Sequence, residues 1–289
     1  MRNTAYKLTA FTAIISAAGF MIRWLQNMAI YEEETGLARS GMPISFVLIG
    51  FIALAAAAFV FIALRMKRYD APKEAGEALG GQTFLFTAVW AAAVLLMLAS
   101  GAMQLLSANA ENYPSGLIVI HKIVGAATLA GAVMLAVLMT GLSNPEKAGA
   151  RRWCSGLLIL FAGLWLSAAY KTAASDPVLW RSSVEILAIC AAMMAFYHVA
   201  GYFYGQPSPA ASVFFCQFGA FLCVMSAIDE HTAGESLCFA AAAVILLIWS
   251  YSIIANLRPS SKPTEELDSE PRIRPRLSLK RPDVSDREL

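Results

Sequence analysis

The chain has 289 residues, of which 58% are hydrophobic and only 15% charged, and its formal net charge is +2. Soluble domains carry roughly 25% charged residues, and the charges of this chain are gathered in short segments between long apolar runs. This pattern indicates a helical membrane protein rather than a globular core. The small net charge gives no indication of nucleic-acid binding.

Eight apolar segments are long enough to form transmembrane helices, because about 20 residues cross the hydrocarbon layer. The first is too long for the core of a signal peptide, so we expect it to remain in the mature protein. The seventh is the shortest, and Gln217 and Gly219 dilute its apolar character. In chain order the predicted spans are 7–30, 44–66, 83–107, 115–142, 153–174, 178–205, 210–228 and 232–257. The predicted fold is an all-α polytopic bundle of about eight spans, within a transmembrane domain over residues 1–257.

The lysines and arginines between the spans indicate the orientation of the bundle. With the N-terminus inside, nine basic residues before the tail are cytoplasmic: Arg2, Lys7, Arg65, Lys67, Arg68, Lys73, Lys147, Arg151 and Arg152. The other side receives three: Arg39, Lys171 and Arg181. Basic residues favour the cytoplasmic side, so we predict that both ends of the chain are in the cytoplasm. The predicted location is the cell membrane, crossed several times.

Residues 258–289 differ from the rest of the chain, because they are rich in proline, serine and charge and contain no aromatic residue. We predict a disordered cytoplasmic tail. A basic cluster lies within it, formed by Arg272, Arg274, Arg276, Lys280 and Arg281. Such a cluster can bind anionic lipid beside the inner leaflet, although an ordinary soluble tail would have the same composition.

Ionisable side chains inside the spans are costly and are therefore the first candidates for function. Arg23, Lys122 and Glu185 each lie about seven residues from the outer end of their span. At 1.5 Å per residue this is a depth of roughly 10 Å. Gln26 and His121 belong to the same group, and Gln104, Tyr170, Lys171 and Glu235 are expected at or near the same level. We predict an outer polar layer with two cations and one carboxylate, and therefore a spare positive charge.

Two functions remain open for this layer. In the first, Arg23, Gln26, His121, Lys122 and Glu185 line an outward-opening cavity that binds, or helps to transport, a small anionic solute or a lipid headgroup. In the second, the protein is a non-catalytic membrane scaffold or sensor, and the charges form a structural network between helices. Long arginine and lysine side chains can also extend to the membrane interface.

Catalytic and cofactor sites are not indicated by any motif. The sequence contains neither HExxH, nor GxxxxGK[ST], nor GxSxG, so an enzyme is the less favoured class. The five cysteines all lie in apolar runs without a CxxC pair, which suits small apolar residues better than metal ligands. The three histidines lie at different levels and are too few for the haem A synthases, which share the layout of eight spans. We therefore expect no cofactor and no metal.

The N-terminal region contains Arg23-Trp24-Leu25-Gln26, then Glu34-Thr35-Gly36-Leu37, then Gly41-Met42-Pro43. This stretch resembles the start of a family of uncharacterised eight-span membrane proteins from anaerobic Gram-positive bacteria. Those proteins similarly have an arginine and a glutamine late in the first span, followed by an acidic-x-Thr-Gly-Leu loop. The resemblance covers the first forty-odd residues and implies a bacterial plasma membrane, but it implies no activity.

Overall fold

The computed structural model describes residues 1–30, 43–72, 74–80, 84–109, 115–140, 142, 147–175, 182–229 and 231–259. One compact unit covers Met1–Pro259. The basic cluster of the tail and the Glu34–Leu37 motif lie outside the described residues. The helices are α1 (Arg2–Ile30), α2 (Pro43–Met66), α3 (Ala75–Leu79), α4 (Phe84–Ser107), α5 (Ser115–Met139), α6 (Ala148–Ser175), α7 (Ser183–Phe203), α8 (Pro209–Ser226) and α9 (Ala233–Asn256).

All helices except the short α3 are long and apolar enough to cross a membrane, so the described chain contains eight candidate spans. This confirms the predicted all-α bundle, and the predicted boundaries differ from the observed ones by about five residues or fewer. Two helices begin at a proline: α2 at Pro43 and α8 at Pro209. Proline is tolerated in the first turn of a helix because its missing N–H would have no partner there. The protein is therefore a multi-pass membrane protein.

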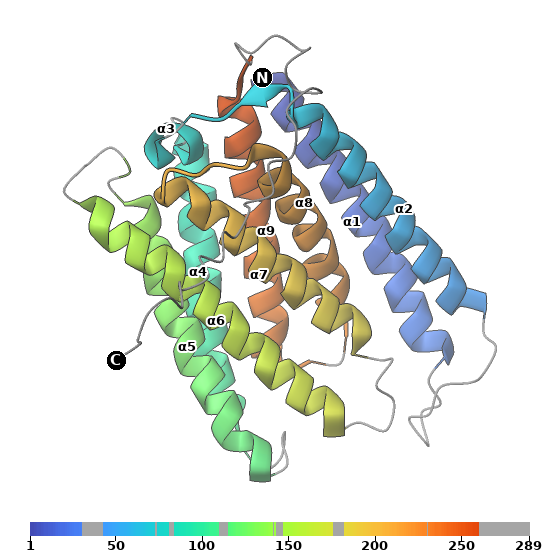
Figure 1. Ribbon diagram of the computed structural model, residues 1–289. Coiled ribbons are helices and arrows are strands. Elements are labelled where there is room, and N and C mark those ends of the chain that lie inside the picture. Colours follow the sequence, from blue (N-terminus) through green and yellow to red (C-terminus); the bar gives the residue numbers. More distant parts are fainter. Residues whose placement is uncertain are drawn as a thin grey trace, which may run out of the picture. The chain divides into compact units, whose positions relative to one another are not determined.

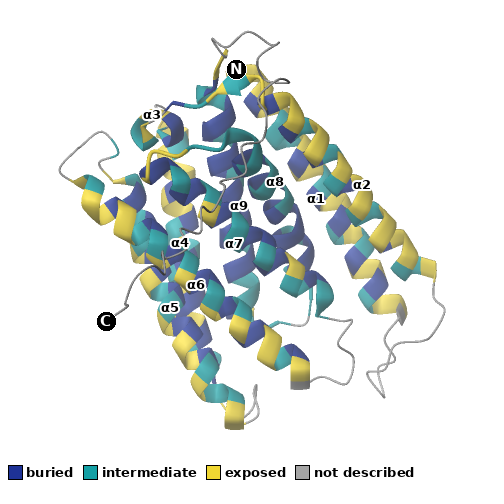
Figure 2. Ribbon diagram, in the orientation of Figure 1, coloured by how far each residue is buried: buried dark blue, intermediate teal, exposed yellow. Residues whose placement is uncertain are grey.

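The centre of the bundle is formed by α8 and α9, which are the most buried of the eight spans (Figures 1 and 2). α8 contacts α1, α2, α7 and α9, whereas α9 contacts α1, α4 and α8 most extensively. The helices α4, α5, α6 and α7 pack in succession, and α1 and α2 lie on the other side of α8 (Figure 1). The seventh span, which has the weakest apolar signal in the sequence, is thus a central helix that is shielded from lipid.

Small residues allow the helix backbones to come close together. Between α4 and α5, a Cβ atom added to Gly101 would lie 2.9 Å from the backbone nitrogen of Leu129. A Cβ added to Gly125 would lie 3.1 Å from the backbone nitrogen of Leu105. Side chains larger than hydrogen would therefore force these two helices apart.

At the end of the bundle that the basic residues predict to be cytoplasmic, α3 contacts α9 and α7. Strand β1 (Tyr69–Asp70) pairs in antiparallel fashion with β2 (Arg258–Pro259), so Arg258 and Pro259 extend the folded unit beyond the predicted domain boundary. The Asn256 side chain donates to the carbonyl oxygens of Ala78 and Gly80 at 3.0 and 3.1 Å. These bonds hold α3 against the last turn of α9. We call the opposite end, where α1 ends and α9 begins, the outer end.

Candidate functional site

Arg23 is the centre of a first polar cluster at the outer end. Its side chain is only 1% exposed. Nε and Nη2 donate to the two carboxylate oxygens of Asp229 at 2.7 and 3.1 Å, which is the bidentate geometry of the strongest ion pairs. Nη1 donates to Oε1 of Gln26 at 2.7 Å. The Asn27 amide also donates to Asp229, at 3.0 Å. We call Arg23, Gln26, Asn27 and Asp229 the arginine cluster.

The spacing along α1 explains why these side chains meet. Residues 23, 26 and 27 are three and four positions apart, so they share one face of the helix. Ser16 and Gly19 lie on the same buried face, which packs against α8. Asp229 follows the end of α8, and its backbone N–H donates to the Ser226 carbonyl. Packing of α1 against α8 therefore brings the guanidinium to the carboxylate.

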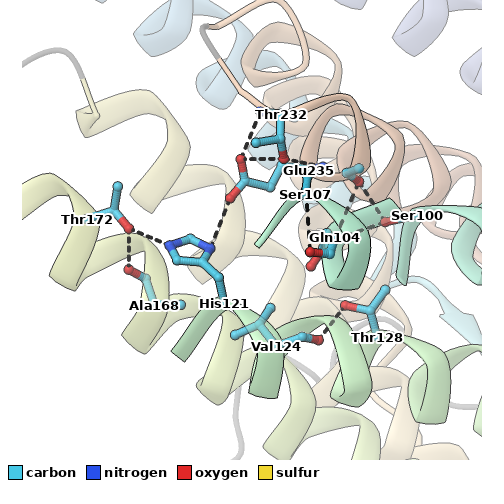
Figure 3. A network of polar contacts seen from close by, with 11 residues as sticks. Ser100, Gln104, Ser107, His121, Val124, Thr128, Ala168, Thr172, Thr232 and Glu235 are labelled. Carbon is cyan, nitrogen blue, oxygen red and sulfur yellow. Dashed lines mark hydrogen bonds and ion pairs between the residues drawn. The ribbon is translucent and has the colours of Figure 1, made fainter. Parts of the chain in front are cut away.

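His121 is the centre of a second polar cluster, which joins α5, α6 and α9 (Figure 3). Its Nδ1 lies 3.3 Å from Oε1 of Glu235, and its Nε2 lies 3.0 Å from Oγ1 of Thr172. The Thr172 hydroxyl is also 3.1 Å from the carbonyl oxygen of Ala168, one turn earlier on α6. The three residues come from three helices and are arranged as hydroxyl, imidazole and carboxylate. We call His121, Thr172 and Glu235 the histidine cluster.

The start of α9 fixes the position of Glu235. Thr232 is the N-cap of this helix, and its side chain accepts from the Glu235 N–H at 3.4 Å. In return, Oε2 of Glu235 accepts from the backbone N–H and the hydroxyl of Thr232, both at 3.0 Å. This reciprocal pattern is a capping box. It uses Oε2 as an acceptor and leaves Oε1 directed at His121.

A third set of contacts anchors the same turn of α9 to α4 (Figure 3). The Ser100 hydroxyl donates to the Gly234 carbonyl at 2.7 Å, and the Gln104 amide donates to the Ser100 hydroxyl at 3.0 Å. Gly234 permits this approach, because an added Cβ would lie 2.7 Å from the backbone nitrogen of Gln104. The first turn of α9 is thus held by α4, α5 and, through His121, by α6.

The connection between α8 and α9 links the two clusters. Asp229 lies in this connection, and Glu235 follows six residues later in the first turn of α9. Glu185, in the first turn of α7, is within electrostatic range of Glu235, Asp229 and Arg23. Among the described residues it forms no hydrogen bond or ion pair. The outer layer therefore holds three described carboxylates around one deeply buried guanidinium.

A cavity of about 290 Å³ lies beside the arginine cluster, between α1, α2 and α7. Its polar lining residues are Arg23, Gln26, Ser45 and Ser183. Its apolar lining residues are Leu48, Ile49, Ile52, Ala53, Ala56, Val184 and Leu187. Ile49 and Leu187 are each more than 40% exposed. The cavity therefore opens sideways, on the flank of the bundle that faces lipid in a membrane.

The lining of the cavity changes from polar to apolar with depth. Ser45 is in the first turn of α2 at the outer end, and the lining continues along α2 to Ala56. Eleven residues of helix span about 16 Å. Polar groups therefore surround the outer part of the cavity, and apolar side chains surround the part that extends into the hydrocarbon layer.

The structure brings together only some of the predicted site residues. Arg23 and Gln26 contact each other and line the cavity, and His121 is buried in the second cluster. Lys122 is exposed on α5. Consecutive residues on a helix point about 100° apart, so Lys122 cannot share the buried face of His121. Glu185 lies two residues from Ser183 and two from Leu187, and therefore does not face the cavity.

The predicted spare positive charge is not what the described residues show. Arg23 is balanced by Asp229 rather than by Glu185, and Lys122 is directed away from both clusters. Two partners were not identified from the sequence: Asp229, which lies between two spans, and Thr172, which is a common residue in a helix. In the sequence, Asp229 stands beside Glu230 in a short acidic segment, which was the only signal for it.

Metal binding and nucleophilic catalysis are not indicated by the part of the chain that is described. It contains no group of three or more His, Cys, Asp or Glu side chains that could hold a metal ion. His198 contacts Ser208 and stacks on Phe215 near the opposite end. The order hydroxyl–imidazole–carboxylate of the histidine cluster is also that of nucleophilic triads, but the described cavity lies beside the arginine cluster and not beside Thr172.

Comparison with known protein families, curated proteins and solved structures finds no match to this chain. The resemblance of the N-terminal motifs to uncharacterised eight-span proteins of Gram-positive bacteria therefore stays a prediction.

Proposed function

We propose that this protein binds the headgroup of a phosphate-containing lipid in the cavity between α1, α2 and α7, from the outer side of the cell membrane. The observation that carries the proposal is the lining of the cavity, which is polar at the outer end and apolar below it. A lipid of the outer leaflet has the same order of groups. Its headgroup would lie at the level of Ser45 and Ser183, and an acyl chain would follow α2 inward.

The polar groups suit phosphate and ester oxygens. The hydroxyls of Ser45 and Ser183 and the amide of Gln26 can donate hydrogen bonds, and the guanidinium of Arg23 lines the same cavity. The Arg23–Asp229 ion pair holds this guanidinium in place. Because Asp229 neutralises Arg23, the headgroup would be held by hydrogen bonds and not by a spare cation.

Binding from the outer side is favoured over passage through the bundle. At the opposite end, the described residues hold α3 against α9 and pair β1 with β2, and the described spans are not interrupted by proline. Transporters often bind their substrates at broken helices. The orientation, with the cavity on the non-cytoplasmic side, is supported by the distribution of basic residues between the loops.

Thermal unfolding in detergent, with and without added ligand, tests the proposal. A ligand at 100 times its Kd stabilises the folded state by about 2.7 kcal/mol. We expect phosphatidylglycerol to raise the Tm of the wild-type protein in a saturable manner. Ala53→Trp should abolish this rise by filling the cavity. Ala57→Trp is the matched control, because Ala57 is exposed on the same helix and does not line the cavity.

Two results would contradict lipid binding. In the first, the lipid raises the Tm of Ala53→Trp and of Ala57→Trp as much as it raises the Tm of the wild-type protein. In the second, inorganic phosphate alone produces the full rise and Ala53→Trp removes it, which would indicate a small anionic solute instead. We expect phosphate alone to have no effect, since it cannot use the apolar part of the cavity.

A structural role of the charges is the second candidate, and the tight pairing of Arg23 with Asp229 and Gln26 favours it. In that case the protein would be a scaffold or sensor whose partners are other proteins. Ser45→Ala combined with Ser183→Ala separates the two functions, because it leaves the ion pair intact. The lipid proposal expects a weaker response to lipid at unchanged stability, whereas the scaffold proposal expects no lipid response in any variant.

A further inference from the structure

We propose that α1 and α2, at the ends that are predicted to be cytoplasmic, form a binding surface for anionic phospholipids of the inner leaflet. Five exposed basic side chains make up this surface, which we call the inner basic patch: Arg2, Lys7, Arg65, Lys67 and Arg68. The patch lies at the opposite end of the bundle from the arginine cluster, and the proposal does not depend on what occupies the cavity. It is carried by the grouping of these charges beside apolar side chains that face lipid.

The packing of α1 beside α2 brings the five residues to one end of this helix pair (Figure 1). The two helices run in opposite directions, and the rings of Phe11 and Phe59 are in edge contact, with centroids 6.5 Å apart. Lys7 lies four residues from Phe11 toward the inner end, and Ala63 lies four residues from Phe59 in the same direction. Lys7 and Arg65 are therefore about two residues apart along the helix axis, or roughly 3 Å.

The basic side chains of the two helices converge on the level of the lipid headgroups. In an α-helix, the bond from Cα to Cβ is tilted toward the N-terminus of the helix. On α1 this direction leads out of the membrane, so Lys7 extends toward the headgroups from within the helix. On α2 it leads into the membrane, and Cζ of Arg65 lies over the ring of Phe61, 4.5 Å from its centroid. The guanidinium of Arg65 is therefore held at the membrane interface.

The charge of the inner basic patch is not balanced by the described residues around it. None of its five side chains forms an ion pair with a described residue. In the described part of the segment between α2 and α4, Glu77 is paired with Arg258 at 3.0 Å, and the remaining acidic residues are Asp70 and Glu74. The five cations thus exceed the nearby described carboxylates, and the patch attracts anions.

The apolar side chains beside the patch favour a lipid over a soluble anion. Tyr6, Phe61 and Leu64 are each more than 50% exposed on the same stretch of α1 and α2. These side chains lie beside the acyl chains in a membrane, so the charges next to them are at the bilayer surface. Each basic residue near an anionic surface contributes a factor of about five to binding. The surface therefore fits a lipid that brings a phosphate to the charges and acyl chains to the apolar side chains.

Native mass spectrometry of the full chain in a neutral detergent tests the proposal by measuring the binding of single phospholipids. The parent protein is Ala53→Trp, in which the outer cavity is filled, so failure of the cavity site is distinguishable from failure of the patch. We expect this parent to bind phosphatidylglycerol at least fivefold more tightly than phosphatidylcholine. The preference should shrink as ammonium acetate is raised from about 0.1 M to about 1 M, because the Debye length falls from about 10 Å to about 3 Å.

Neutral variants of the patch identify the residues that bind the lipid. Lys7→Gln/Arg65→Gln/Lys67→Gln, which we call the patch variant, should lower the affinity for phosphatidylglycerol at least tenfold. Lys67→Gln/Arg68→Gln changes only exposed residues that follow α2, so it tests the same surface without altering a helix, and should lower the affinity at least fivefold. Lys7→Arg/Arg65→Lys/Lys67→Arg keeps the charges and should retain the preference.

The matched control removes three exposed basic residues from other parts of the described chain: Lys122→Gln, Lys147→Gln and Lys171→Gln. It changes the net charge as much as the patch variant does, and the basic residues of the tail are the same in both. Its affinity for phosphatidylglycerol should stay within threefold of the parent. Thermal unfolding without added lipid verifies that each variant is folded.

Three results would overturn the proposal. The first is equal affinity of the parent for phosphatidylglycerol and phosphatidylcholine, and the second is an equal loss of affinity in the patch variant and the control. The third is complete displacement of phosphatidylglycerol by glycerol 1-phosphate, which would indicate a soluble phosphate ester as the ligand. If the patch variant kept its affinity for phosphatidylglycerol and lost only the binding of a polyglutamate peptide, the surface would belong to an acidic protein instead.

Discussion

Arg23 and Asp229 are 206 positions apart in the chain and form a bidentate ion pair that joins the outer part of α1 to the connection between α8 and α9. The guanidinium is almost fully buried, at 1% exposure, and the carboxylate is 11% exposed. Charges in such a position are stable only when they are paired. The pair therefore determines how α1 is placed against the centre of the bundle, and with it one wall of the cavity.

Removal of Asp229 should strongly destabilise the protein. Asp229→Ala leaves the guanidinium of Arg23 buried without its carboxylate, a change that typically costs about 3–5 kcal/mol. Unfolding in detergent, followed by circular dichroism, gives the measurement. Glu77→Ala is the control, because it breaks the ion pair between Glu77 and Arg258, which are both more than half exposed. Exposed pairs contribute about 0–1 kcal/mol.

The double variant Arg23→Leu/Asp229→Leu tests whether the two side chains stabilise the protein as a pair or independently of each other. It removes both charges, so it should be more stable than Asp229→Ala. If the double variant lost as much stability as the sum of the two single leucine variants, the two side chains would act independently. That result would contradict the coupling that the bidentate geometry indicates.

Gly234→Ala should loosen the packing of α9 against α4. The added Cβ would lie 2.7 Å from the backbone nitrogen and 3.1 Å from the Cα of Gln104. Backbone atoms cannot rotate away, so the two helices must separate and the hydrogen bond from Ser100 to Gly234 must lengthen. Overpacking of this kind costs about 1–3 kcal/mol, measurable as a lower Tm in detergent.

Gly163→Ala on α6 is the matched control for this packing effect. No heavy atom lies within 4 Å of a Cβ added at Gly163. Alanine also has the higher helix propensity, by about 1 kcal/mol, so this variant should be as stable as the wild type or slightly more stable. Equal stability of the two variants would show that α9 can move away from α4 without cost.

The membrane spans could be predicted from the sequence because their signal is local. The length of each apolar run and the prolines at the helix ends are read directly from consecutive residues. The two clusters were harder to predict from the sequence, because they depend on the rotation of each helix about its axis. His121 and Lys122 illustrate this: they are neighbours in the sequence, but one is buried against Glu235 and the other is exposed.

The partners of the buried charges depend on contacts between distant segments. Arg23 lies inside a span, and its side chain is buried; its functional role stays a prediction. The sequence offered Glu185 as a carboxylate at a similar depth. Asp229 is the actual partner because α1 packs against α8 and brings residue 23 to the end of that helix. A single sequence contains no periodicity from which this contact could be derived.

The orientation of the bundle leads to a labelling prediction. Asn109 follows α4 at the outer end, and Gln206 lies between α7 and α8 at the opposite end; both are exposed. In a variant without the half-buried Cys154 and Cys190, Asn109→Cys should react with a membrane-impermeant maleimide in intact cells. Gln206→Cys should react only after the cells are permeabilised. The reverse labelling pattern would contradict the orientation inferred from the basic residues.

Asn256 should control the local stability of α3 without controlling that of the whole bundle. Asn256→Ala removes two hydrogen bonds to the carbonyls of Ala78 and Gly80, each contributing about 0.5–1.5 kcal/mol. We expect the hydrogen exchange of the amides of Glu77, Ala78 and Gly80, which are bonded within this segment, to increase about tenfold.

Arg258→Ala provides the comparison for Asn256→Ala, because its ion pair with Glu77 reaches the same segment from an exposed position. Its effect on exchange should be less than threefold, as expected of an exposed ion pair. Leu79 is fully buried and contributes a separate hydrophobic contact that both variants retain. Unchanged exchange in Asn256→Ala would therefore mean that burial of Leu79 alone holds α3 in place. Faster exchange confined to residues 74–80 would show that Asn256 fastens α3 to the end of α9.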